Sequence, residues 1–85
     1  KAGMLSLTRT IAREMARKGI TCNAVTPGVI ETDMTEGVTD KLLAGVPAGR
    51  IGRPEEVAHA VSFLCSDGAA YVNGATLAVD GALAA

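Results

Sequence analysis

An apolar stripe marks the first helix that the sequence predicts, over residues 2 to about 18. Its members recur at intervals of three and four residues, which is the spacing of one helix face: Met4, Leu7, Ile11 and Met15. Basic residues near the end of this segment complement the negative end of a helix dipole. Gly19 stands where a left-handed residue commonly closes a helix. The sequence therefore predicts both this helix and its end.

A second amphipathic helix is predicted to begin at Pro54 and to end near residues 66–68. Proline is tolerated at the first helical position, and Glu55 and Glu56 would lie at the positive end of the dipole. The apolar positions again follow helical spacing: Val57, Ala60, Val61 and Leu64. A shorter helix is expected at 40–44, with Thr39 or Asp40 as its cap.

Two short apolar runs, residues 20–26 and 75–79, are typical of buried strands. The first, "ITCNAVT", ends at Pro27-Gly28, and the second, "ATLAV", precedes "DGALAA". Strands that alternate with helices indicate an α/β architecture with a parallel sheet. Such sheets rarely stop at two strands, so an edge of the first strand is expected to need a neighbour. The pattern favours part of a larger sheet.

Composition narrows the function classes. The chain has 85 residues, 48% of them hydrophobic, with a net charge of −1, one Tyr, one Phe and no Trp. This length suits one domain, and the neutral balance gives no field to attract nucleic acid or an anionic membrane. No apolar run approaches a membrane span and no signal peptide is evident, so we expect a cytoplasmic protein without a membrane partner.

The cysteines and the histidine give no sign of a metal site. Cys22 and Cys65 are too few and too far apart to suggest a disulfide framework or a CxxC site, and we expect both to be buried free thiols. His59 is a lone histidine, without a second His, Cys or carboxylate at ligand spacing. No metal is therefore expected.

The stretch "TPGVIETDM", Thr26 to Met34, follows the first predicted strand. In open parallel sheets, ligands bind beyond the carboxyl ends of strands. Gly28 lacks a Cβ and would let a ligand approach the backbone, and Thr32 or Asp33 could cap a helical turn that favours an anion. The alternative is that Pro-Gly only turns the chain and Thr32 only caps a helix. These residues by themselves leave both interpretations open.

Three stretches resemble the C-terminal third of the short-chain dehydrogenase/reductase family: "NAVTPGVIETDM", "VPAGRIGRPEEVAHAVSFLCSD" and "AAYVNGATLAVDG". Within the family they most resemble the 3-oxoacyl-[acyl-carrier-protein] reductases. The resemblance implies that residues 1–85 form a single partial domain, the C-terminal part of a Rossmann-type doubly wound parallel sheet with two strands and about three helices. It also implies reduction of a 3-oxoacyl thioester of acyl carrier protein or CoA in fatty-acid synthesis. The implied cofactor is NADPH, with NAD not excluded, and the implied assembly is a homotetramer.

The resemblance assigns roles to individual residues. "KAGMLSL" places Lys1 at the lysine of the family's Tyr-x-x-x-Lys motif, where it would bind the nicotinamide ribose and lower the pKa of the catalytic tyrosine. The pattern Pro-Gly-x-Ile-x-Thr is met by four cofactor-binding candidates: Pro27, Gly28, Ile30 and Thr32. Ile30 would contact the nicotinamide carboxamide through its backbone. Thr32 would bond to the carboxamide or the pyrophosphate.

A lid and a docking patch complete the implied site. The lid would run from Met34 to about Val46, shorter than in close relatives, with four candidate substrate contacts: Met34, Thr35, Val38 and Leu42. Arg17 and Lys18 match a region that presents a basic patch to the acidic carrier protein. They equally suit a solvated helix end that satisfies its dipole.

The family's glycine-rich loop, catalytic Ser and catalytic Tyr would all lie upstream of Lys1, and Tyr71 belongs to a turn. We therefore expect the isolated chain to lack turnover. Two alternatives stay open: a short-chain dehydrogenase for another carbonyl or alcohol substrate, and a non-catalytic remnant that uses its helices for association.

Overall fold

The computed structural model describes residues 1–32 and 40–85 of the chain. Helices and strands alternate in it. The α-helices are α1 (Ala2–Met15), α2 (Asp40–Ala44) and α3 (Pro54–Leu64), the strands are β1 (Ala24–Pro27) and β2 (Thr76–Val79), and single 3₁₀ turns span Ala16–Lys18 and Asp67–Ala69.

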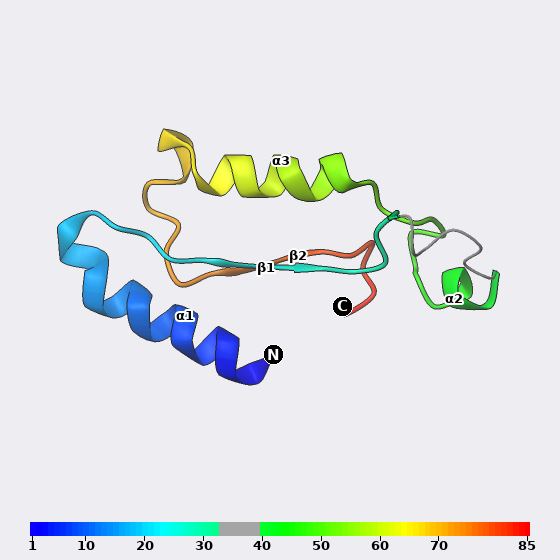
Figure 1. Cartoon of the computed structure of the whole chain (residues 1–85), viewed down its shortest axis with the longest axis horizontal. Coiled ribbons are helices and arrows are strands. Elements are labelled where there is room, and N and C mark those ends of the chain that lie inside the picture. The colour runs from blue at the N-terminus through cyan, green and yellow to red at the C-terminus, as the bar shows by residue number, and fades with distance from the viewer. Residues whose placement is uncertain (33–39) are drawn as a thin grey trace.

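The two strands pair in parallel, from Ala24 opposite Thr76 to Pro27 opposite Val79. Helix α3 packs against both strands, and Figure 1 shows α3 and α1 on opposite sides of them. The connection from β1 to β2 passes through α2 and α3, which is the crossover that parallel strands require. The predicted α/β fold with two parallel strands and three helices is confirmed.

Helix α1 ends close to the predicted place. After Met15 the chain tightens into the 3₁₀ turn, and Gly19 takes the left-handed conformation with φ 74°. Its N–H donates to the carbonyl of Ala16 at 3.1 Å. The expected C-cap glycine is therefore confirmed, and only the last turn differs from a regular α-helix.

The first strand begins later than predicted, at Ala24 instead of residue 20. Just before it, the N–H of Cys22 donates to Oδ1 of Asn73, and the Cys22 carbonyl accepts the Gly74 N–H. Asn23 bridges the same turn by donating to the Val72 carbonyl and accepting the Ala75 N–H. Asparagine side chains thus replace ladder bonds at the amino ends of both strands.

Of the two caps expected for the short helix, Asp40 is the first residue of α2 and does not precede it. Thr39 lies outside the described residues, so its role as the cap stays a prediction. One prediction about packing is wrong. Cys65 is exposed and Cys22 is only partly buried, so the expectation that both thiols are buried is wrong. The reason for Cys65 is local, because α3 ends at Leu64 and Cys65 lies at the end of the helix as its C-cap.

Small side chains form the buried centre of the described chain. The residues that are buried are Thr8, Ala12, Ala24, Val46 and Ala69. Large apolar side chains stay outside, with Met4 69% and Leu7 59% exposed on α1. The Cα radius of gyration is 15.0 Å, against about 12 Å for a compact domain of this length. The fold is thus extended, with apolar helix surface left uncovered.

Among the helices of the described residues, none is long and apolar enough to cross a membrane.

Candidate functional site

The carboxyl end of β1 lies against the end of β2. The N–H of Gly28 donates to the Val79 carbonyl at 3.0 Å. A Cβ placed on Gly28 would lie 2.7 Å from the Cβ and 2.8 Å from the Cα of Asp80. The missing side chain of Gly28 therefore admits the neighbouring strand end at Asp80. The cofactor-binding role expected for Gly28 stays a prediction.

The chain beyond Gly28 makes a second short parallel pairing, between Ile30 and Gly52. The Gly52 N–H donates to the Val29 carbonyl at 2.9 Å, and the Glu31 N–H donates to the Gly52 carbonyl at 2.8 Å. In this pattern the N–H and C=O of Ile30 face away from Gly52. They make no hydrogen bond with any described residue. Ile30 therefore presents one donor and one acceptor at the strand end.

An arginine and a glutamate join this loop to α3. Both Nη atoms of Arg50 donate to Glu56, at 2.7 Å to Oε1 and 2.8 Å to Oε2. The Arg53 N–H donates to the same Oε1 at 3.0 Å, so Glu56 also caps the first turn of α3. The hydrogen bonds from Arg50, followed by the one from Arg53, lower the pKa of Glu56 to about 2. The carboxylate stays ionised throughout the physiological range.

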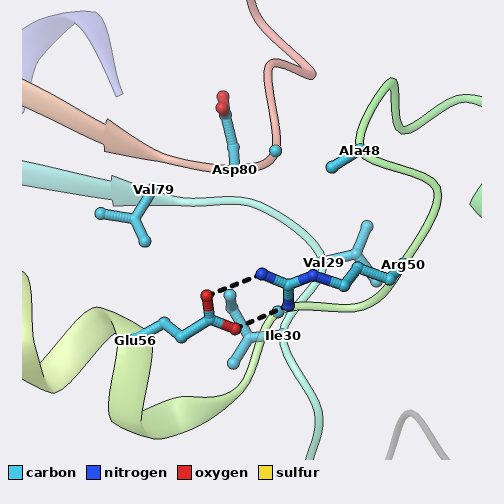
Figure 2. A pocket seen from close by; sticks show the side chains of 9 residues that line it. Val29, Ile30, Ala48, Arg50, Glu56, Val79 and Asp80 are labelled. Carbon is cyan, nitrogen blue, oxygen red and sulfur yellow. Dashed lines mark hydrogen bonds and ion pairs between the residues drawn. The ribbon is translucent and has the colours of Figure 1, made fainter.

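A pocket of about 60 Å³ lies between the strand ends and this ion pair. Figure 2 shows Arg50 reaching from its loop to Glu56 on α3, with Val29 and Ile30 among the lining residues. Ligand pockets for cofactors measure several hundred Å³, so this space suits water molecules. A dinucleotide is too large to fit inside it.

The other described residues that the sequence predicts for the site do not line this pocket. Lys1 is exposed at the start of α1, and its side chain makes no hydrogen bond or ion pair with a described residue. Pro27 ends β1, and Thr32 is exposed beyond Ile30. The lid candidates Met34, Thr35 and Val38 lie outside the described residues, whereas Leu42 is 50% exposed on α2.

Arg17 and Lys18 lie in the 3₁₀ turn that follows α1, and both are exposed. Neither forms an ion pair with another described residue. Their position is compatible with either of the two interpretations given above. The described residues also contain no group of three or more His, Cys, Asp or Glu placed to hold a metal ion.

Sequence reasoning missed the roles of Arg50, Gly52, Glu56 and Asp80. One signal was available for Glu56, because a glutamate at the third position of a helix commonly accepts the N–H of the residue before the helix. No pattern in the sequence indicated that Arg50 reaches the same carboxylate, or that Gly52 pairs with Ile30. Those contacts depend on where the loop lies in three dimensions.

Comparison with known proteins connects this geometry to a family. A family model described as enoyl-(acyl carrier protein) reductase matches residues 1–83. The chain is 52% identical over 98% of its length to the 3-oxoacyl-[acyl-carrier-protein] reductase FabG of Escherichia coli, of which it covers 36%. It is likewise 52% identical to the FabG of Pseudomonas aeruginosa, of which it covers 35%. The chain thus spans about a third of these curated relatives.

Solved structures give the same relationship. An NADP-bound crystal structure from Agrobacterium tumefaciens, provisionally described as a 2-deoxy-D-gluconate 3-dehydrogenase, superposes with a TM-score of 0.91 at 44% identity. It matches 98% of this chain, which covers 36% of that structure. A short chain dehydrogenase from Bacillus anthracis matches all of this chain, with a TM-score of 0.87, 43% identity and 35% of its own length covered. The chain therefore belongs to the short-chain dehydrogenase/reductase family and corresponds to the C-terminal portion of its Rossmann fold.

Proposed function

We propose that the chain supplies the nicotinamide-side wall of an NADPH-dependent reductase that converts a 3-oxoacyl thioester to the 3-hydroxyacyl form. The observation that carries the proposal is the N–H and C=O of Ile30, just beyond the carboxyl end of β1, which point away from Gly52 and bond to none of the described residues. The 52% identity to the Escherichia coli reductase supports the choice of substrate class. Because NADP is bound in a structural relative, NADPH is the proposed cofactor, with NAD not excluded.

The main-chain groups of Ile30 suit the carboxamide of nicotinamide. A carboxamide has an oxygen that accepts and an NH₂ that donates. The Ile30 N–H would donate to that oxygen, and the Ile30 carbonyl would accept from the NH₂. Thr32, two residues on, would bond to the carboxamide or the pyrophosphate. Bound here, the cofactor would supply the hydride.

Lys1 would act on the catalytic tyrosine, the acid that protonates the substrate oxygen. Its ammonium group would bind the nicotinamide ribose and favour ionisation of a catalytic tyrosine supplied by an upstream segment, since a nearby cation lowers a phenol pKa. Met34, Thr35, Val38 and Leu42 would close over the acyl chain. Arg17 and Lys18 would meet the acidic carrier protein.

The test joins the chain to the glycine-rich loop, catalytic Ser and catalytic Tyr that the family carries upstream of the lysine matched to Lys1. Residues 1–85, fused behind the part of the Escherichia coli reductase that precedes the lysine matched to Lys1, are expected to oxidise NADPH when acetoacetyl thioester is added. The Lys1→Ala variant of the fusion should lose most of this activity, and residues 1–85 by themselves should show none. A folded fusion without NADPH oxidation would contradict the proposed function.

A different carbonyl or alcohol substrate is the second candidate, favoured by the 0.91 TM-score to the structure described provisionally as a sugar-acid dehydrogenase. The same fusion would be assayed with NADP and 2-deoxy-D-gluconate. Faster turnover with the sugar acid than with the thioester would select this candidate.

The exposed stripe on α1 supports association of the intact protein as a homo-oligomer, which we propose to be a tetramer. Met4 and Leu7 present apolar side chains to solvent on one helix, and closed symmetric assemblies commonly cover such surfaces. Sedimentation of the fusion, compared with its Met4→Gln/Leu7→Gln variant, would test this. Equal masses for the two would count against the stripe as the contact.

A further inference from the structure

The loop of residues 50–52 joins the candidate nicotinamide wall to α3. On one side, Gly52 pairs with Ile30 through two main-chain hydrogen bonds. On the other side, Arg50 holds both carboxylate oxygens of Glu56 at 2.7 and 2.8 Å. The loop therefore lies between α3 and the residue that would meet the cofactor.

The ion pair does more than cap α3. Capping needs only the bond from the Arg53 N–H to Glu56 Oε1, at 3.0 Å. The second carboxylate oxygen is bound by Arg50, whose Nη1 also donates to the Ile51 carbonyl at 3.3 Å. A bidentate pair of this kind fixes direction as well as distance. The guanidinium thus holds the backbone immediately before Gly52 in one position.

Gly52 transmits that position to Ile30. A Cβ placed on Gly52 would lie 2.8 Å from Ile30 Cδ1, so the Ile30 side chain rests directly on the glycine. The bonds from Gly52 to Val29 and from Glu31 to Gly52 flank Ile30 on both sides. A shift of the loop would therefore move the Ile30 main chain.

We propose that Arg50 and Glu56 are positioning residues that orient the Ile30 main chain for the nicotinamide carboxamide. The consequence for the cofactor rests on the proposed function, whereas the consequence for the Ile30–Gly52 pairing does not. Arg50 acts through Gly52 and touches no substrate. Substitution of Arg50 should weaken the pairing between Ile30 and Gly52 and leave β1 and β2 paired.

The first experiment measures amide hydrogen exchange by NMR in residues 1–85. Arg50→Ala should speed exchange of the Glu31 and Gly52 amides about two- to fivefold, the range for an exposed ion pair, relative to the Ala24 amide. Ala24 donates to Ala75 at the far end of the strands and is the internal reference. If the Ala24 amide is unprotected in the isolated chain, the same ratio is measured in the fusion protein.

Arg53→Ala is the matched control. It removes an arginine three residues away, with the same change of net charge, and its Nε lies 3.7 Å from Glu56 while its main-chain cap remains. Arg53→Ala should leave the exchange ratio unchanged, and Arg50→Lys should give an intermediate value. An unchanged ratio in Arg50→Ala, or equal acceleration of all three amides, would overturn the proposal.

The second experiment measures kinetics in the fusion protein. Arg50→Ala should raise the KM for NADPH about two- to fivefold with kcat nearly unchanged, as expected when ground-state and transition-state binding weaken together. Arg50→Lys should recover part of the loss, and Arg53→Ala should match the parent. A lowered kcat with unchanged KM would refute the assigned role. A parent fusion without activity would contradict the proposed function. The amide-exchange ratio would still decide whether Arg50 positions Ile30.

Discussion

The carboxyl end of the sheet and the first half of α1 are held in different ways. At the sheet end, main-chain hydrogen bonds join Gly28 to Val79 and join Gly52 to the two neighbours of Ile30. An ion pair ties the loop to α3. Helix α1 is anchored near its middle, where Thr8 and Ala12 are buried, and its start is exposed with Met4 and Leu7. The sheet end is thus held by contacts among described residues, whereas the start of α1 leaves large apolar side chains exposed.

Gly28→Ala should lower the unfolding free energy more than any other change, because it adds a side chain where the ends of β1 and β2 are in contact. The new Cβ would meet the main chain of Asp80 at under 3 Å, and overpacking of this kind costs about 1–3 kcal/mol. Urea denaturation would measure the loss of unfolding free energy. Gly52→Ala is the matched control, since its Cβ would come under 3 Å only to the terminal methyl of Ile30, which can rotate away, and lies at an ordinary 3.7 Å from the Val29 carbonyl oxygen. Equal losses in the two variants would show that the strand ends are not closely packed.

Asn73→Ala should weaken the link between α1 and the sheet. The Asn73 side chain accepts the Cys22 N–H at 3.0 Å and donates to the Ala12 carbonyl at 3.3 Å. Loss of both bonds should cost about 1–2 kcal/mol in thermal or urea unfolding. Asn73→Asp keeps the acceptor and should lose less. A neutral Asn73→Ala variant would mean that burial of Ala12 by itself holds α1.

Gly3→Ala should have the opposite sign to Gly28→Ala. Nothing lies within 4 Å of a Cβ placed on Gly3, and alanine is favoured over glycine inside a helix by about 0.5–1 kcal/mol. Circular dichroism of the two proteins should show equal or greater helix content and a higher unfolding midpoint. A destabilised Gly3→Ala protein would imply that a neighbour covers the start of α1 in solution.

Titration of Glu56 should give the smallest effect on the whole molecule. Its folded pKa of about 2 lies below the ordinary value of 4.5. The carboxylate therefore stabilises the fold above about pH 4.5, and the contribution is lost as the pH falls toward 2. Carboxyl NMR should show the Glu56 pKa rising toward its ordinary value in Arg50→Ala. A pKa that stays near 2 in that variant would assign the shift to the Arg53 N–H.

Local signals in the sequence were sufficient to predict most of the helices and strands. Helical spacing of apolar residues located α1 and α3, Gly19 marked the end of α1, and Pro54 marked the start of α3. These features act over a few residues, so no distant contact is needed to recognise them. The start of β1 was misplaced because the Asn73 side chain accepts the Cys22 N–H and the Asn23 side chain accepts the Ala75 N–H. These contacts join residues that lie far apart in the sequence.

The sequence by itself determined the alternation of helices and strands, and through its motifs the resemblance to a reductase family. Only the tertiary structure decided that Asp80 fills the space beside Gly28, and that Arg50 and Gly52 join α3 to Ile30. The physical reason is that these contacts depend on the mutual placement of three loops, each of which can turn in several ways. Helix periodicity and caps are fixed by neighbours along the chain, whereas strand ends and ion pairs across loops are fixed by packing.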